Sequence, residues 1–331
     1  LPQFFMASDQ STYFGRVQHF VKLIDPSLLL KTDADLLQAQ ALIDEFKNKA
    51  GSAPPPGSPE LKRLWEAQTL LDASVHPQTH EPIPLPLRLA AFVPVNIPIV
   101  AGMLLSPPTV ANAALWQWVN QTYNALFNWA NANKSKDPSD EARRNETKNT
   151  LMAYGSATAV SVSLAVGLNE GLKRATLSPG MRTVLQRVVP FTAVAGAGVF
   201  NAVLMRSNEL IEGIPVEDSS GRTLGKSRLA ARHALTQVAI SRIVLPAPVL
   251  ILPPPLIALA LRIPLVSKTK ALKVLTEVSI ISLSLWGALP AAIALFPQKM
   301  KLSVTHLEPS FHELRTEDGE PVTEVLLNKG L

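Results

Sequence analysis

Five long apolar segments constrain what this chain can fold into more than any other feature. A helix needs about 20 consecutive apolar residues to cross a bilayer. Of the 331 residues, 47% are hydrophobic and only 17% are charged, which is unusually apolar for a soluble domain of this length. We therefore predict an all-α, polytopic helical membrane protein with about five transmembrane helices, placed near residues 88–106, 151–171, 188–205, 237–260 and 275–296.

The flanking segments divide the chain into three predicted parts. Residues 1–84 form an N-terminal soluble helical arm, because a helical pattern over 33–50 is followed by a proline-rich linker at 51–59. Ser58 can cap the next helix, and Pro59 suits its first turn. The transmembrane helical domain covers residues 85–299, and a C-terminal soluble tail covers residues 300–331. Within the domain, the turn signal at residues 218–221 favours a small hairpin.

Neutral amides distinguish the segment 110–131, which is a candidate sixth membrane helix. With about 3.6 residues per turn, the amides fall within an arc of about 100° and leave aromatic and aliphatic side chains opposite. Amides donate to carboxylates and accept from ammonium groups, which would suit a small zwitterion inside a membrane. An interfacial helix, or amide hydrogen bonds between helices, would explain the same pattern. The amide stripe comprises Gln117, Asn120, Gln121, Asn124, Asn128 and Asn131.

Prolines in the segment 237–260 are incompatible with one regular helix, since each removes a backbone hydrogen bond. We predict a broken helix, whose freed backbone groups face protein or a watery cavity, as in secondary transporters. A merely kinked helix is the alternative. The prolines that would form this gating segment are Pro246, Pro248, Pro253, Pro254 and Pro255.

Isolated polar side chains within the spans are costly in hydrocarbon unless they face the interior of the bundle. Arg242 lies one turn before the proline break, where it could hold a carboxylate through two parallel hydrogen bonds. Its alternative is to extend toward lipid headgroups. The predicted substrate-binding set is Asn96, Gln117, Asn120, Gln121, Asn124, Asn201, Gln237, Ser241 and Arg242.

Small residues recur every four positions along the span 151–171. Such a ladder allows a neighbouring helix backbone to approach closely, so we expect tight packing on this face whatever the function. The small-residue ladder comprises Gly155, Ala159, Ser163, Gly167 and Gly171.

Several classes of function find no support in the sequence. The chain contains no cysteine, and the signatures of nucleotide-binding loops, zinc peptidases and serine hydrolases are missing, so we expect neither catalytic residues nor a cofactor. The net charge of +5 is spread between apolar blocks, without the basic cluster of a nucleic-acid-binding protein. His76 and His80 are separated by Pro77, which argues against a helical metal site, so a turn that anchors the arm is the preferred interpretation.

The ordered motifs of the chain closely resemble those of the sideroflexins, a family of the mitochondrial inner membrane. The resemblance runs nearly from end to end. It rests on Gly15-Arg16-Val17, Asp25-Pro26, His76-Pro77, Trp116 to Gln121 with Asn124-Ala125, Val189 to Val194, Asn201, Leu204 to Arg206, Gly213 to Val216, Thr236 to Val238, Ser241-Arg242, Leu295 to Lys299 and Asn328 to Leu331.

This resemblance implies a multi-pass mitochondrial inner-membrane protein, imported without a cleaved presequence, that transports serine for one-carbon metabolism. Alanine is implied as a related substrate, the bilayer is the expected neighbour, and the sequence identifies no protein partner. The family pattern after His76-Pro77 carries over only at Thr79 and Glu81, with no role assigned to these four residues. Val249 replaces the glycine that follows the Ala-Pro pair at the proline break.

Two other functions stay open at this stage. A membrane scaffold for respiratory-complex assembly or iron metabolism would use the N-terminal arm and the loop at 206–236. A tricarboxylate carrier would need several convergent cations, whereas the spans offer Arg242 and a few arginines at helix ends.

Overall fold

The computed structural model describes residues 12–48, 54–55, 57–76, 79–131, 140–218, 222–296, 299–315 and 321–328. Within these residues, helices long and apolar enough to cross a membrane are Thr150–Arg174, Pro179–Met205, Arg228–Ala260 and Lys270–Ala294, with a shorter apolar helix at Leu89–Leu105. The predicted polytopic helical membrane fold is therefore confirmed. The proline-containing span begins at Arg228, earlier than the sequence indicated.

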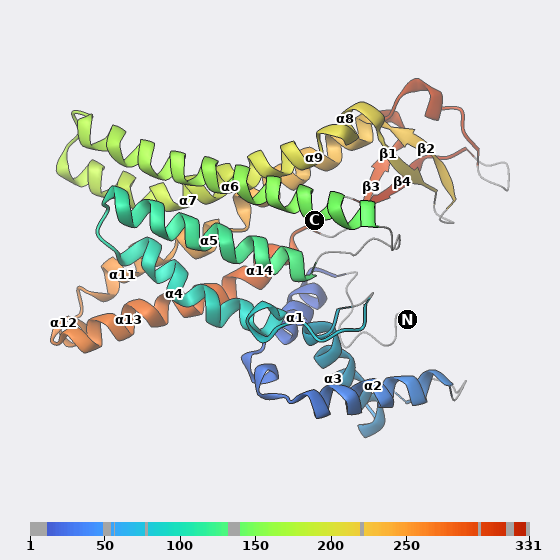
Figure 1. Cartoon of the computed structure of the whole chain (residues 1–331), viewed down its shortest axis with the longest axis horizontal. Coiled ribbons are helices and arrows are strands. Elements are labelled where there is room, and N and C mark those ends of the chain that lie inside the picture. The colour runs from blue at the N-terminus through green and yellow to red at the C-terminus, as the bar shows by residue number, and fades with distance from the viewer. Residues whose placement is uncertain are drawn as a thin grey trace.

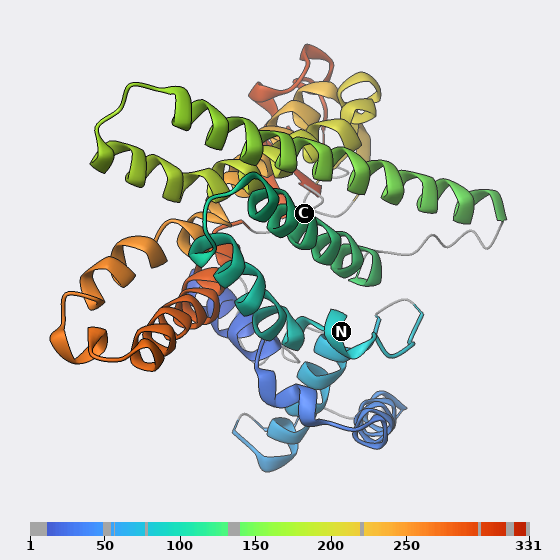
Figure 2. The same ribbon diagram turned by 60° about the vertical axis from the view of Figure 1, so that its left-hand side comes forward.

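The membrane helices form an elongated bundle in which successive segments run alternately toward its two ends (Figure 1). The long helices α6 and α7 form a hairpin, and α5 packs beside α6, as Figure 2 shows from a second side. The main helices are α4 (Phe92–Leu105), α5 (Val110–Asn131), α6 (Asp140–Arg174), α7 (Pro179–Met205), α8 (Ser207–Glu212), α9 (Arg228–Val244) and α13 (Lys270–Leu283).

Large apolar side chains cover much of the outer surface of these helices. A water-soluble monomer rarely exposes so many of them, whereas lipid tails solvate them without cost. The exposed set includes Leu151, Met181, Val184, Phe200, Val203, Ile240, Ile243, Leu256, Leu259, Leu275 and Leu283.

The predicted broken helix is present after α9. This helix ends at Val244, and the chain continues through the short helices α10 (Ala247–Leu250), α11 (Pro253–Ala260) and α12 (Pro264–Ser267). Pro246 lies in the turn before α10, and Pro253 begins α11, as expected for residues that cannot donate a helical hydrogen bond. A second irregularity, the π-helix Ser284–Ala288, joins α13 to α14 (Leu289–Ala294).

Close contacts between α4 and α5 fix which face of α5 points inward. Gly102 lies against the ring of Trp116, and a Cβ at this glycine would overlap that ring. Phe92 of α4 stacks edge-on against Phe127, with ring centroids 5.0 Å apart, and also contacts Tyr123 at 6.1 Å. With these aromatic rings packed against α4, the amide stripe of α5 turns toward the centre of the bundle.

The small-residue ladder of α6 does not make the predicted packing contact. All five ladder residues are exposed, and a Cβ at Gly155, Gly167 or Gly171 would meet no atom within 4 Å. The close approach between α6 and α7 occurs at Gly196, where a Cβ would lie 2.6 Å from Cδ1 of Leu164. Periodicity located a face of small residues but not the neighbour, because the sequence does not say which face turns inward.

The N-terminal arm contains α1 (Tyr13–Leu23), the 3₁₀ turn Pro26–Leu30, α2 (Asp33–Asn48) and α3 (Pro59–Ser74). The predicted cap is confirmed, since Ser58 Oγ accepts from the N–H of Leu61 at 3.2 Å. Helix α1 contacts the membrane domain directly: Tyr13 Oη donates to the carbonyl of Ala291, and Arg16 Nε donates to that of Ala294. Short 3₁₀ turns at Leu85–Leu87 and Leu89–Ala91 lead from the arm into α4.

A four-stranded sheet in the order β2-β1-β4-β3 joins two distant parts of the chain at one end of the bundle (Figure 1). The antiparallel hairpin of β1 (Ile214–Glu217) and β2 (Thr223–Ser227) confirms the hairpin prediction, although its turn at 219–221 lies outside the described residues. Glu217 is paired with Leu326 of β4 (Glu324–Asn328), which in turn pairs with β3 (Lys299–Ser303). Strands in the predicted C-terminal tail were not anticipated.

Glu308, from the C-terminal segment, caps the start of α9. Its carboxylate accepts from the Ser227 hydroxyl at 2.6 Å and from the backbone N–H groups of Arg228 at 2.8 Å and Leu229 at 3.1 Å. Burial opposes ionisation, but these hydrogen bonds outweigh it and hold the pKa of Glu308 below its ordinary value. An acidic group at a helix N-terminus also interacts favourably with the helix dipole.

We expect Glu308→Gln to lower the free energy of unfolding by about 1–2 kcal/mol near neutral pH, since a charged hydrogen-bond acceptor is lost. A carboxyl whose pKa is depressed by folding stabilises above its unfolded pKa, and this stabilisation is lost as pH falls through the folded pKa. Thermal unfolding between neutral and acidic pH measures both effects. The exposed Glu313→Gln is the control; equal behaviour of the two variants would contradict the capping role.

Candidate functional site

A cavity of about 290 Å³ lies at the centre of the bundle, between the amide stripe of α5 and the proline break. Helices α4, α5, α7 and the segment from α9 to α10 supply most of its wall, and Ala157 of α6, the π-helix and α14 complete it. Its polar lining residues are Asn96, Asn120, Gln121, Asn124, Asn128, Asn201 and Arg242.

The structure brings together most of the predicted substrate-binding residues in this central cavity. Asn96, Asn120, Gln121, Asn124, Asn201, Arg242 and the gating residue Pro246 all line it. It does not bring Gln117, Gln237, Ser241, Pro248, Pro253, Pro254 or Pro255 to the cavity wall. Ser241 is buried, but its hydroxyl donates to the carbonyl of Val238 at 2.6 Å within its own helix.

Arg242 supplies the only charged side chain among the lining residues that the structure describes. No carboxylate lines the cavity, and no hydrogen bond or ion pair joins the guanidinium to another described residue. The aliphatic stem of Arg242 lies on Gly198 of α7, where an added Cβ would be 3.2 Å from the Arg242 Cβ. A guanidinium held in this way is available for a planar anion such as a carboxylate.

Two amides in the cavity wall retain unsatisfied polar atoms. Asn120 Nδ2, a donor, and Asn201 Oδ1, an acceptor, are both buried without a hydrogen-bond partner among the described residues. Asn96 differs, because its Nδ2 donates to the carbonyl of Phe92 at 2.8 Å. Buried polar atoms that lack partners are uncommon and usually mark a place for water or a ligand. The wall of the cavity thus combines one cationic residue, Arg242, with two amides that each keep one buried polar atom without a partner.

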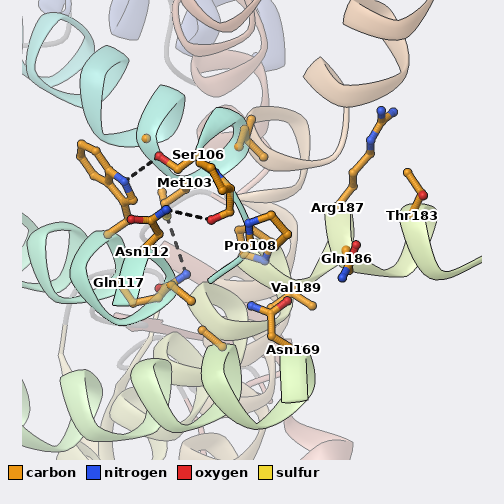
Figure 3. A pocket seen from close by; sticks show the side chains of 17 residues that line it. Met103, Ser106, Pro108, Asn112, Gln117, Asn169, Thr183, Gln186, Arg187 and Val189 are labelled. Carbon is orange, nitrogen blue, oxygen red and sulfur yellow. Dashed lines mark hydrogen bonds between the residues drawn. The ribbon is translucent and has the colours of Figure 1, made fainter. Parts of the chain in front are cut away.

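Gln117 lines a second cavity of about 210 Å³, toward the α4–α5 loop and the start of α7 (Figure 3). The two cavities share one lining residue, Met103. Gln117 Nε2 contacts Met103 Sδ at 3.7 Å, and Asn169 of α6 lies on the facing side of the space. The amide stripe of α5 therefore serves two spaces instead of one.

The His76 motif lies in a compact turn apart from both cavities. His76 Nδ1 accepts from the N–H of Thr79 at 3.2 Å, and the His76 N–H donates to the carbonyl of Glu81 at 3.0 Å. These bonds show the predicted turn, while its role as an anchor of the arm stays a prediction and residues 77–78 lie outside the described residues. Among the described residues there is no group of three or more histidine, cysteine or acidic side chains that could hold a metal ion.

Sequence reasoning missed Gly198 and Met103 at this site, and it left Asn128 out of the binding set. Asn128 could have been included, since it falls on the same arc of α5 as the other amides. Nothing in the sequence indicates that Gly198 faces Arg242, because that contact depends on how α7 and α9 cross. Glycine in a helix is otherwise a destabilising choice.

Replacement of Gly198 tests this contact. In a helix, Gly→Ala normally stabilises by about 0.5–1 kcal/mol. We expect Gly171→Ala to show this gain, because its Cβ would meet no atom within 4 Å. Gly198→Ala should lose the gain or destabilise, because its Cβ crowds the Arg242 stem. Thermal unfolding of both variants in detergent measures the difference, and an equal gain would show that Arg242 does not rest on Gly198.

The fold and the central cavity define a polytopic helical membrane protein with a polar site between its helices, beside a broken helix. The family model described as Sideroflexins matches residues 2–331, and the chain belongs to the sideroflexin family. It is 40% identical to a sideroflexin of Dictyostelium discoideum over 324 residues, covering 98% of this chain and 95% of that protein. It is also 40% identical to sideroflexin-5 of Homo sapiens over 324 residues, covering 97% and 90%. The chain is 36% identical to sideroflexin-2 of Mus musculus over 324 residues, which cover 98% of this chain and 95% of that protein. No solved structure matches the chain.

Proposed function

We propose that this protein is a transporter of small neutral amino acids, with L-serine as the principal substrate and alanine as a related one. The observation that carries the proposal is the lining of the central cavity, in which Arg242 shares the wall with several amides and no carboxylate. A zwitterion needs a cation or donors for its carboxylate and acceptors for its ammonium group. The site supplies both kinds of group.

The cost of removing a zwitterion from water favours a cavity with polar lining residues over an apolar space between the helices. A carboxylate or an ammonium group loses several kcal/mol when it leaves water for hydrocarbon without new partners. In the proposed complex, Arg242 and Asn120 donate to the carboxylate, and Asn201 Oδ1 accepts from the ammonium group. The volume of about 290 Å³ is near the lower limit of ordinary ligand pockets, roughly 300 Å³, which favours a small amino acid.

The family supports the proposed location and role. We place the protein in the mitochondrial inner membrane, where serine import would supply one-carbon metabolism. The proposed mechanism requires no cofactor, metal or catalytic residue. The broken helix from Pro246 to Pro255 would act as the moving wall, because short helices joined by turns can shift separately.

A membrane scaffold is the second candidate function. It is supported by apolar side chains on the N-terminal arm, where Phe14, Leu30 and Leu37 are all strongly exposed. Tricarboxylate transport is ranked lower, because the cavity lining provides a single cation for three negative charges.

Uptake of labelled L-serine into liposomes that contain the purified protein tests the proposal. We expect saturable uptake that unlabelled alanine reduces and citrate does not, because the cavity balances one carboxylate and one ammonium group. D-serine reports stereospecificity. Lack of uptake by protein that is demonstrably folded would favour the scaffold, and competition by citrate would favour a tricarboxylate carrier.

Single substitutions in the cavity test the assigned roles. We expect Asn120→Leu and Arg242→Gln each to lower the uptake efficiency by about 10-fold or more, since each removes a hydrogen bond to a charged group. Thr122→Val is the matched control on α5, because the Thr122 hydroxyl bonds to the Trp118 carbonyl and to Tyr154 Oη, so its loss removes polar contacts of α5 that do not line the cavity. Normal uptake by the two cavity variants would make the amide stripe structural and the mechanism wrong.

A further inference from the structure

The two cavities follow one another along a single face of α5. Ala113 and Gln117 line the second cavity, and Gln121 and Asn124 line the central cavity. Since these positions are three or four residues apart, they form one stripe along the helix. The second cavity lies nearer to the start of α5, and Ala113 is about 16 Å from Asn124 along the helix axis.

Helices α6 and α7 place the two cavities in the same order. On α7, Arg187 and Pro190 line the second cavity, and Val194, four residues further on, lines the central cavity. On α6, which runs back alongside α7, Asn169 lines the second cavity and Ala157 the central one. All three helices therefore put the second cavity between the central cavity and the end of the bundle that carries the α4–α5 and α6–α7 loops.

Exposure of the lining residues decreases from this end of the bundle inward. Pro107 and Pro108 of the α4–α5 loop are exposed, as are Thr183 and Arg187 near the start of α7. Gln117, on the inner side, is 2% exposed. The second cavity is therefore an indentation that begins at the end of the bundle opposite the sheet, which Figure 1 shows at the far end of α7.

The mouth of the second cavity carries a positive charge. Arg187 is the only charged side chain among the lining residues that the structure describes, and it forms no hydrogen bond or ion pair with another described residue. In Figure 3 its side chain extends away from Gln117 and Asn169, on the side of the exposed Thr183. The amide nitrogens of Asn169 and Gln186 also have no hydrogen-bond partner in the described part of the chain. A wall of this kind attracts a carboxylate and repels a cation.

Met103 separates the two cavities. It lines both of them, and its Sδ is 3.7 Å from Gln117 Nε2. The backbones of α4 and α5 are held together next to this point, because Gly102 lies directly against the ring of Trp116. The methionine side chain is unbranched and changes rotamer easily. The boundary between the cavities therefore depends on a flexible side chain and not on helix backbone.

We infer that the second cavity is the vestibule through which the substrate reaches the central cavity, from the membrane face opposite the sheet. Arg187 at its mouth attracts the carboxylate of a small amino acid, and Met103 is the side chain that the substrate displaces to pass inward. The inference rests on the proposed function for the identity of the substrate. The preference of the vestibule for anions is a property of its own residues.

Single introduced thiols can probe the vestibule, because the chain contains no cysteine. Ala113→Cys places a thiol in the lining of the second cavity, and Ser163→Cys places one on the exposed outer face of α6. Each protein, in lipid nanodiscs, is treated with water-soluble methanethiosulfonates that carry either a sulfonate or a trimethylammonium group. Each rate is divided by the rate of the same reagent with free mercaptoethanol. We expect Ala113→Cys to react, and Ser163→Cys to stay unmodified because lipid covers it.

The charge preference is assigned by replacing Arg187. In Ala113→Cys, we expect the normalised rate of the sulfonate reagent to exceed that of the trimethylammonium reagent about 10-fold at low salt, because a positive mouth concentrates anions. High salt should reduce this ratio, and Arg187→Gln should bring it close to one. Arg174→Gln is the matched control, since Arg174 is an exposed arginine at the same end of the bundle that does not line the cavity.

Uptake tests whether the vestibule lies on the transport route. Ala113→Cys is fully modified by the sulfonate reagent in detergent, reconstituted into liposomes and compared with the unmodified variant. We expect the modification to remove most of the L-serine uptake, because the added group fills the space in front of Met103. The same treatment of Ser163→Cys should leave uptake unchanged.

Three results would overturn the inference. The first is a thiol in folded Ala113→Cys that is no more reactive than the thiol in Ser163→Cys, which would mean that water does not enter the cavity. The second is a charge preference that Arg187→Gln does not change. The third is serine uptake that persists in fully modified Ala113→Cys, which would place the route elsewhere. If folded, unmodified protein takes up no serine but keeps the Arg187-dependent preference for anions, the proposed substrate is wrong and the vestibule remains.

Discussion

Inside the hydrocarbon of a bilayer, a polar group must find its hydrogen-bond partner in the protein or in a cavity within it, and this constraint organises the packing around α5. The helix carries uncharged amides on one face and aromatic rings on the other. Phe92 of α4 holds the rings of Tyr123 and Phe127, so the amides turn toward the other helices. The central cavity follows from this arrangement, because the amides of α5 face Asn201 and Arg242 across it.

The parts of the fold that follow from local rules could be predicted from the sequence. Apolar length located the membrane helices, and the missing N–H of Pro246 and its neighbours located the break. The sheet was beyond such rules, since β4 pairs with β1 more than a hundred positions earlier. Nor could periodicity say that the ladder of α6 faces outward, because it defines faces and not neighbours.

The predicted substrate-binding residues also show the difference between what local sequence rules predict and what depends on the packed structure. A helix advances about 1.5 Å per residue, so Gln117 and Asn124 lie about 10 Å apart along α5 even though they share one face. Angular position correctly grouped the amides, but axial distance separated them between two cavities. One cavity combines Arg242 with several amides, and the other is lined by Gln117, Asn169 and Gln186. The thioether of Met103 is the flexible side chain between them, and it can change rotamer without losing a strong hydrogen bond.

The pairing of β1 with β4 also constrains the membrane topology of the chain. A single hydrogen-bonded sheet cannot be divided by a bilayer, so the stretch between α7 and α9 and the stretch after α14 emerge on the same face. The residues between them must then cross an even number of times, which makes Arg228–Ala260 and Lys270–Ala294 an outward and a return passage. The basic turn around α12, with Arg262 and Lys268, lies on the opposite face. Locating one strand relative to the membrane therefore fixes the orientation of this whole half of the molecule.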